Sequence, residues 1–276
     1  MTPTLHLALH LILIGTGLVA AMMFVLWAIH LVTRNAGIVD VGWVMGLVLL
    51  TGVAVVHAPI TAAGIHTWGL TIMVTLWGVR LGLHILIRME SGPEDPRYAQ
   101  MRREWKTFIP LKFLAFFELQ ALLDVVLALP FLAIALDPSP RVSPLCYVGV
   151  AIWFVAVIGE TISDVQLSRF KRIAANKGKV CRVGLWNYSR HPNYFFEWLI
   201  WVAWAALALP SPGGYVGLIG PILMFYFLFR VTGIPATEAQ ALRSRGDAYR
   251  EYQETTSAFV PWFRKKSQSE LRSMPL

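Results

Sequence analysis

Charged residues are scarce in this chain, and cysteine is almost absent. Only 14% of the 276 residues are Asp, Glu, Lys or Arg, while 56% are hydrophobic. A typical soluble domain has about 25% charged residues, so the composition excludes an ordinary soluble protein. The two cysteines, Cys146 and Cys181, are expected on opposite sides of a membrane, which excludes a disulfide between them. The seven His residues show no metal-ligand spacing, so we expect no metal site.

Long uncharged stretches recur along the chain, and they define the fold class. A helix that spans a bilayer needs about 20 mostly apolar residues. We therefore predict an all-α integral membrane protein, a seven-transmembrane helix bundle that forms a single polytopic domain over residues 1–276. The expected spans are Leu5–Val32, Ile38–His57, His66–Ile87, Phe113–Leu136, Pro144–Val165, Tyr194–Leu209 and Tyr215–Phe229.

The net charge of +8 is distributed very unevenly. If the N-terminus faces the periplasm and the C-terminus the cytoplasm, 22 of the 24 Lys and Arg residues fall in cytoplasmic segments. This asymmetry is the positive-inside pattern of membrane proteins. We predict that orientation in a bacterial inner membrane, with membrane lipids as partners and no nucleic acid.

Ionisable side chains occur inside the predicted spans, most of them towards the cytoplasmic ends. Such groups are costly in lipid unless they are paired or solvated, so they are candidates for function. They could also form buried ion pairs or snorkel to the interface. Because several lie at one level, we predict a polar cavity that opens to the cytoplasm. The residues are Asp40, Arg80, His84, Glu118, Asp124, Glu160, Asp164, Glu197 and Arg230.

The stretch NYSRHPNYFFEW, residues 187–198, places many polar groups where the chain re-enters the membrane. Pro192 suits the first turn of a helix. Arg190 and His191 precede that turn, where free N–H groups and the helix dipole favour an anion. With the basic residues upstream, this pattern indicates a phosphate-binding cofactor site. The alternative is an ordinary positive-inside loop. The tail ends in FVPWF, residues 259–263, and is expected to fold over the cavity and dock at the membrane.

These residues, with Arg230 and GDAYREYQETTSAFVPWF at 246–263, resemble the steroid 5-alpha-reductase family. The chain is most similar to an uncharacterised bacterial branch that also has stretches like GIVDVGW and EDPRY. Isoprenylcysteine carboxyl methyltransferases and sterol reductases share the RHPxY core more distantly, so this core identifies a superfamily and not a reaction. The resemblance implies a seven-helix bundle that holds NADPH in a cytoplasm-facing cavity, with a cofactor-binding half at about 144–264.

The resemblance also implies which side chains contact the cofactor. The positions that match family contacts are Arg80, Asp164, Lys171, Asn193, Glu197 and Arg230. The same motif block and the tail complete the predicted cofactor-binding set with Tyr188, Arg190, His191, Tyr194, Glu238 and Tyr252.

Two positions depart from the family pattern, and both bear on the chemistry. Trp77 stands where those enzymes have a catalytic Tyr, and an indole cannot donate a proton to an oxyanion as a phenol does. Phe196 replaces a usual Gly. The acid of the second span is Asp40, and Tyr98 is a second candidate, so these two are the predicted catalytic residues.

The predicted function is a membrane-embedded NADPH-dependent reductase. Its substrate would be a carbon–carbon double bond in a hydrophobic, steroid-like or other lipid enone. Two alternatives remain open. One is a membrane methyltransferase that uses S-adenosylmethionine, and the other is a non-catalytic lipid-binding protein of the same fold.

Overall fold

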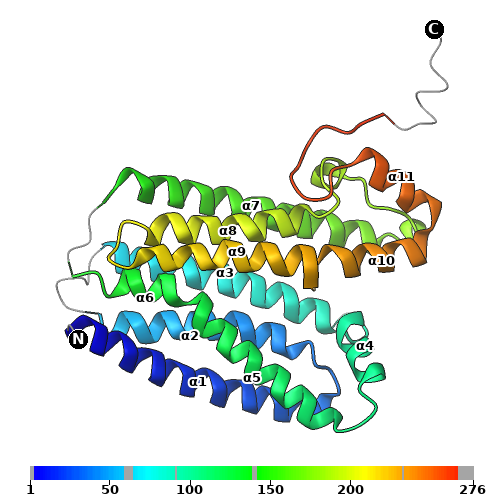
Figure 1. Cartoon of the computed structure of the whole chain (residues 1–276). Coiled ribbons are helices and arrows are strands. Elements are labelled where there is room, and N and C mark those ends of the chain that lie inside the picture. The colour runs from blue at the N-terminus through cyan, green and yellow to red at the C-terminus, as the bar shows by residue number, and fades with distance from the viewer. Residues whose placement is uncertain (1–2, 59–64, 91, 139–141, 232, 267–276) are drawn as a thin grey trace. The chain divides into compact units, whose positions relative to one another are not determined.

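The computed structural model describes residues 3–58, 65–90, 92–138, 142–231 and 233–266 (Figure 1). Within these ranges every regular element is a helix, and the sole β-type contact is an isolated bridge between Ser189 and Ser257. The predicted all-α class is therefore confirmed. The chain divides into two compact units: an N-terminal unit, Met1–Ser143 with Leu207–Ile219, and a C-terminal unit, Pro144–Ala206 with Gly220–Leu276.

In the N-terminal unit, one helix is central. α2 contacts α1, α3, α5 and α6, and glycines on its faces allow the close approach. A Cβ at Gly46 would overlap the carboxyl group of Asp124 on α5. Asp124 is fully buried, and neither of its carboxyl oxygens has a hydrogen-bond partner among the described residues. The elements are α1 (Pro3–Thr33), α2 (Ile38–Val56), α3 (Ile65–Glu90), α4 (Pro96–Glu104), α5 (Ile109–Leu127), α6 (Leu129–Ala135) and the 3₁₀ turn η3 (Gly214–Leu218).

The fourth predicted span, Phe113–Leu136, is divided in the structure. α5 ends at Leu127 and α6 starts at Leu129, with Pro130 in its first turn. A proline there has no N–H to give to the preceding turn, so the continuous helix stops just before it. The span is therefore two helices in series.

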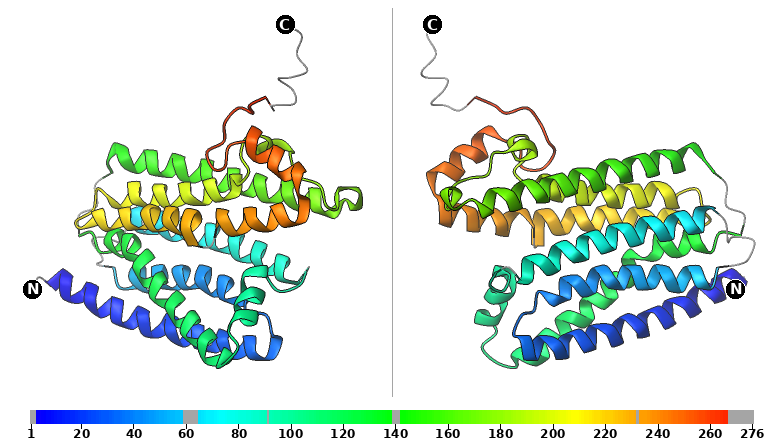
Figure 2. Two further views of the ribbon diagram at one scale, coloured as in Figure 1. Left: turned by 45° about the vertical axis from the view of Figure 1, so that its right-hand side comes forward. Right: turned by 180° about the vertical axis from the view of Figure 1, so that it is seen from behind.

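The C-terminal unit holds two long helices that lie side by side, α7 and α8 (Figures 1 and 2). Apolar side chains remain exposed along one face of α7 at Val155, Ile158, Ile162 and Val165. This spacing of three and four residues forms one stripe, as expected for a helix that faces lipid. The elements are α7 (Pro144–Arg172), the 3₁₀ turns η1 (Ala174–Asn176) and η2 (Gly184–Asn187), α8 (Pro192–Ala208), α9 (Ile219–Tyr226), the π-helical turn η4 (Phe227–Val231), α10 (Ile234–Arg245) and α11 (Asp247–Thr255).

Six helical segments in the described ranges are long and apolar enough to cross a membrane. They confirm a polytopic membrane protein. The seven-helix count stays a prediction, because the sixth expected span corresponds to α8, which has 17 residues. That length is at the lower limit of about 17–25 residues for a membrane-spanning helix.

Candidate functional site

The RHPNY motif begins α8 in the C-terminal unit, and the loop before it is fixed on α7. Gly184 adopts a φ of +56°, and a Cβ there would overlap the side chain of Gln166, so this turn requires glycine. The backbone N–H of Leu185 donates to Oε1 of Gln166 at 2.9 Å, and Nε1 of Trp186 donates to the carbonyl of Ser163 at 2.9 Å. These two bonds determine where α8 starts beside α7.

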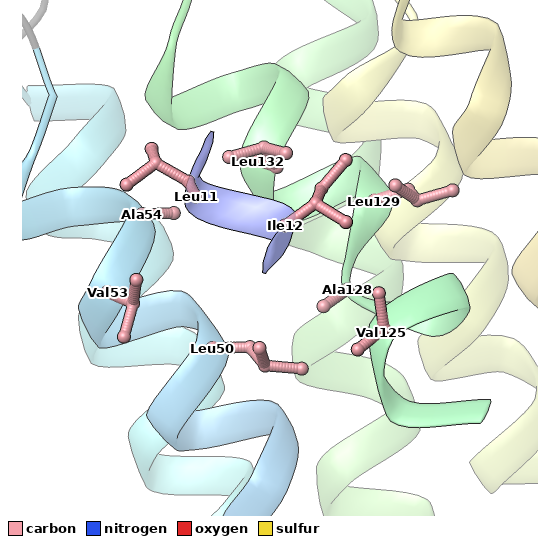
Figure 3. A pocket seen from close by; sticks show the side chains of 9 residues that line it. All are labelled: Leu11, Ile12, Leu50, Val53, Ala54, Val125, Ala128, Leu129 and Leu132. Atoms are coloured by element: carbon pink, nitrogen blue, oxygen red, sulfur yellow. The ribbon is translucent and has the colours of Figure 1, made fainter. Parts of the chain in front are cut away.

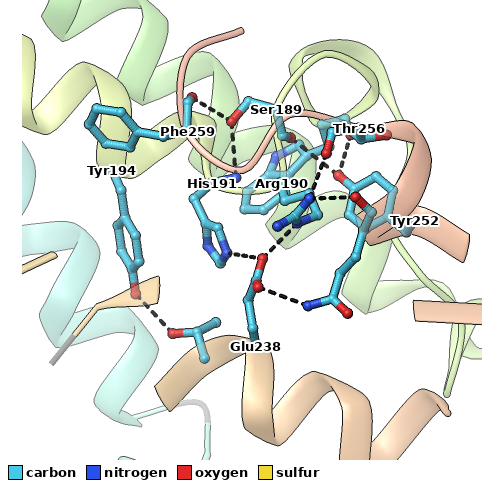
Figure 4. Close-up of polar contacts among 11 residues, drawn as sticks. Ser189, Arg190, His191, Tyr194, Glu238, Tyr252, Thr256 and Phe259 are labelled. Atoms are coloured by element: carbon cyan, nitrogen blue, oxygen red, sulfur yellow. Dashed lines mark hydrogen bonds and ion pairs between the residues drawn. The ribbon is translucent and has the colours of Figure 1, made fainter. Parts of the chain in front are cut away.

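Arg190 forms a buried ion pair with Glu238 of α10 (Figure 4). Its Nε lies 2.6 Å from Oε1 of Glu238, and the two side chains are only 10% and 14% exposed. Nη1 of the same guanidinium donates to the carbonyls of Gln253 at 2.9 Å and Thr256 at 2.6 Å. The sequence predicted a cofactor contact for Arg190. In the structure its Nε binds Glu238 of α10, and its Nη1 binds carbonyls at the end of α11 and just beyond it.

Glu238 is the centre of a wider polar cluster. Nε2 of His191 lies 3.3 Å from its Oε1, and Nε2 of Gln253 donates to its Oε2 at 2.8 Å (Figure 4). The His191 ring stacks on Tyr194, with the planes 7° apart and the centroids 5.3 Å apart. Tyr194 in turn shares a hydrogen bond of 3.3 Å with Thr237. Four residues of the predicted set are thereby brought together, and Gln253 and Thr237 join them without having been predicted.

The segment after α11 is attached to the motif loop mainly through backbone groups. The Arg190 N–H donates to the carbonyl of Ser257 at 2.8 Å, and Oγ of Ser189 donates to the carbonyl of Phe259 at 2.7 Å. The hydroxyl of Tyr252 donates to the carbonyls of Trp186 and Ser189. Burial raises the pKa of Tyr252 well above the ordinary phenol value, so the hydroxyl remains a donor. The C-terminal segment therefore closes over this loop as a strap.

The remaining predicted cofactor residues of this unit lie on α7, α8 and η4. Nδ2 of Asn193 donates to Oδ1 of Asp164 at 3.4 Å, which joins the two long helices by a polar pair. Glu197 accepts from Nε1 of Trp201 at 3.0 Å. Arg230 lies in the π-helical turn η4, a rare conformation that often marks functional sites. Lys171 is exposed near the end of α7, and Tyr188 is exposed beside the strap.

The basic loop separates into two groups of side chains. Arg182 donates to Glu251 at 3.2 Å and, like Arg190, contacts the tail. The other five basic residues between 169 and 190 remain exposed: Arg169, Lys171, Arg172, Lys177 and Lys179. These five side chains are accessible to solvent.

Phe196 fills a space that a neighbouring glycine leaves open. A Cβ at Gly159 of α7 would overlap the Phe196 ring, so the two positions are complementary in size. The substitution of the family's usual glycine on α8 is thus balanced by a glycine on α7.

The two predicted catalytic residues come together in the N-terminal unit. The hydroxyl of Tyr98 donates to Oδ1 of Asp40 at 2.5 Å, and Nη2 of Arg97 donates to Oδ2 of Asp40 at 2.9 Å. Arg88 lies 3.9 Å from the same carboxylate. The cationic partners of Asp40 in the structure are therefore Arg97 and Arg88.

The EDPRY stretch, residues 94–98, supplies most of the polar contacts around Asp40 and Tyr98. Asp95 caps α4 by accepting from the Arg97 N–H at 3.0 Å and also binds the Arg97 side chain. Burial alone would raise the pKa of Asp95, but its contacts with Arg97 and the charge of Arg88 hold it below the ordinary value. Glu94 accepts from the Ala36 N–H at 2.9 Å, just before α2.

The phenol of Tyr98 is protonated in this cluster of polar contacts. Burial and the neighbouring Asp40 carboxylate raise the pKa of Tyr98 well above the ordinary value. The proton of the pair therefore resides on the phenol. Trp77, which the resemblance aligns with a catalytic Tyr, is fully buried, and its ring packs edge-to-face on Trp43 at a centroid distance of 6.1 Å. Arg80 follows one turn later on α3.

A pocket in the N-terminal unit has a different chemistry (Figure 3). It lies between α1, α2, α5 and α6, and all nine lining residues are apolar. Such a lining offers no polar side chain to a phosphate or a ribose. The lining residues are Leu11, Ile12, Leu50, Val53, Ala54, Val125, Ala128, Leu129 and Leu132.

Fold and site together define a polytopic helical membrane protein with a buried polar cluster at the start of α8. The chain belongs to the family described as "Protein of unknown function (DUF1295)", whose model matches residues 26–256. This family is associated with steroid 5-alpha-reductase-like membrane proteins, which supports the resemblance at the level of the superfamily.

One relative carries an enzyme name. The chain is 30% identical over 96 residues to "Probable O-methyltransferase ustE" of Ustilaginoidea virens, a match that covers 35% of this chain and 32% of that protein. The chain thus spans about a third of the length of the curated relative it matches. No solved structure matches the chain.

Proposed function

We propose that the protein is a membrane-embedded reductase that uses NADPH to reduce a carbon–carbon double bond of a hydrophobic enone. The observation that carries this proposal is the group of five exposed basic side chains at residues 169–179, which follow the Asp164–Asn193 pair on the same unit. Resemblance to the steroid 5-alpha-reductases supplies the reaction class.

The spacing of these groups suits an extended dinucleotide. Asp164 and Lys171 are seven residues apart on α7, a rise of about 10 Å at 1.5 Å per residue. A carboxylate and an amide at one end can bind ribose hydroxyls and a carboxamide, which both accept and donate hydrogen bonds. Several cations at the other end can bind a pyrophosphate and a 2′-phosphate. Bound NADPH would supply the hydride, and the residues named here would hold and orient it.

A methyltransferase is the second candidate, and two observations favour it. The relative from Ustilaginoidea virens is named as an O-methyltransferase. The C-terminal unit also places Asp164, Glu197 and Glu238 near the start of α8 and α10, and carboxylates suit a cationic sulfonium. Because both Glu238 oxygens already accept hydrogen bonds from protein groups, the cationic cofactor would depend on Asp164 and Glu197.

Cofactor titration of the purified full chain in lipid nanodiscs separates the two. We expect NADPH to bind more tightly than NADH. Replacing Lys177 and Lys179 together by Ala should weaken NADPH binding at least tenfold, since a charge-assisted hydrogen bond contributes about 1.5–3 kcal/mol. Lys106→Ala, at an exposed lysine of the N-terminal unit, is the matched control and should change nothing.

Two results would overturn the reductase. Equal affinities for NADPH and NADH would remove the role of the basic residues in binding a 2′-phosphate. Tight binding of S-adenosylmethionine, unaffected by the paired lysine substitution, would establish the second candidate instead.

A further inference from the structure

The last described segment of the chain combines exposed aromatic rings with a run of basic residues. Trp262 and Phe263 are 65% and 77% exposed, and Arg264, Lys265 and Lys266 follow them directly. Contiguous exposed rings of this kind mark a surface that another apolar phase covers. We name Val260–Lys266 the aromatic–basic segment.

A backbone hydrogen bond fixes the position of this segment along the axis of α7. The N–H of Trp262 donates to the carbonyl of Tyr188 at 2.9 Å, and the Phe263 and Tyr188 rings lie 6.4 Å apart, edge to face. Two residues earlier in the same loop, Trp186 is bonded to the carbonyl of Ser163 on α7. The aromatic–basic segment therefore lies level with the part of α7 around Ser163.

That part of α7 is where its lipid-facing stripe ends. Ile162 and Val165 are exposed apolar residues, and Arg169, one turn further, is exposed and charged. The change from apolar to basic on one helix face marks the boundary between hydrocarbon and headgroups. In Figures 1 and 2 the chain after α11 turns back beside α7 and then runs obliquely away from it.

We propose that the aromatic–basic segment is an interfacial anchor that binds anionic lipid headgroups of the membrane in which the protein lies. Trp262 and Phe263 enter the headgroup region, where amphipathic and aromatic rings are favoured. Arg264, Lys265 and Lys266 attract the anionic headgroups of the cytoplasmic leaflet, on the orientation predicted from charge. The anchor also braces the polar cluster, since the carbonyl of Thr256 that holds Arg190 lies only four residues before it.

A depth measurement in nanodiscs tests this inference. The full chain with Cys146→Ser and Cys181→Ala would carry a single fluorophore at Phe263→Cys. The matched control carries it at Asp247→Cys on α11, whose side chain is 94% exposed. Lipids with quenchers near the glycerol level should quench the label at 263 and leave the label at 247 unaffected. Adding phosphatidylglycerol to phosphatidylcholine discs should increase quenching at 263.

Neutralising the basic run separates lipid binding from protein contacts. Each of Lys265 and Lys266 replaced by Gln should lower the ratio of membrane-bound to released segment in anionic discs about fivefold. Arg264 is left unchanged in this test, because it also lies 3.8 Å from Glu251. In neutral discs the same variants should match the parent. Photoactivatable phosphatidylglycerol, mapped on the unmodified chain, should label the peptide that contains Trp262.

An unquenched label at 263 would overturn the proposal. So would a shielded label that no lipid quencher reaches and that depends on protein concentration, because a second copy would then cover the surface.

Discussion

The buried ion pair between Arg190 and Glu238 gives the sharpest quantitative prediction. Arg190→Ala removes three interactions at once: the ion pair at 2.6 Å and the bonds to the carbonyls of Gln253 and Thr256. Breaking a buried pair costs about 3–5 kcal/mol, because one charge is left buried without its partner. Two carbonyls left without a donor add about 1 kcal/mol each. The expected destabilisation is therefore at least about 5 kcal/mol.

The assay is proteolysis of the strap, with thermal unfolding of the whole protein as a second measure. Arg190→Ala should release the segment after α11 and expose it to protease. Glu238→Gln should have a smaller effect, because an amide oxygen still accepts from Arg190. Arg182→Ala is the matched control: its partner Glu251 is half-exposed, so its loss should cost no more than about 1 kcal/mol. A stable, protease-resistant Arg190→Ala protein that fails to bind cofactor would refute the reasoning, and Arg190 would then be a ligand-binding residue.

Three further predictions address other parts of the molecule. Asp40→Asn should lower the melting temperature, since Arg97 loses one of the two carboxylates that it contacts. Tyr98→Phe removes one hydrogen bond and should keep the fold. Loss of single-turnover reduction in a stable Tyr98→Phe protein would establish the phenol as the acid, and full activity would exclude it. Gly46→Ala should destabilise the protein by about 1–3 kcal/mol, because its Cβ would overlap Asp124. In a protein that already has Asp124→Ala, the same substitution should have almost no effect on stability. Equal costs with and without Asp124→Ala would contradict that contact. Attachment of the strap should weaken as pH rises above about 10. Burial gives Tyr252 a higher pKa in the folded state, so the phenol loses its proton at a lower pH in the released chain than in the attached one. An equally steep pH dependence of proteolysis in Tyr252→Phe would refute this.

Much of the helical architecture could be predicted from the sequence, because long uncharged runs leave few alternatives to a membrane-spanning helix. The break within the fourth span was missed although its signal is present. Pro130 stands 17 residues into the expected Phe113–Leu136 run, where a proline interrupts the backbone hydrogen bonds of a helix. The hydrophobicity of the run gives no sign of this interruption, because proline does not make the stretch less apolar.

The site could be predicted only as a set of residues, without their partners. Asp40 and Tyr98 were both predicted, but their contact joins positions 58 residues apart. The partners of Arg190 are 48 or more residues away, on α10 and beyond. Charge and motif indicate that such groups need a partner, and only the packing of helices determines which one they receive.

The resemblance implies that enzymes with different reactions share the RHPxY core, and the contacts in this chain give a physical reason. In this chain Arg190 and His191 bind Glu238 and the backbone of the strap, and the Tyr194 ring stacks on His191. These contacts join α8, α10 and the C-terminal segment, a task that any reaction in this fold requires. On the proposed function, the choice of cofactor then depends on residues outside the core, such as the Asp164–Asn193 pair and the exposed basic side chains at 169–179.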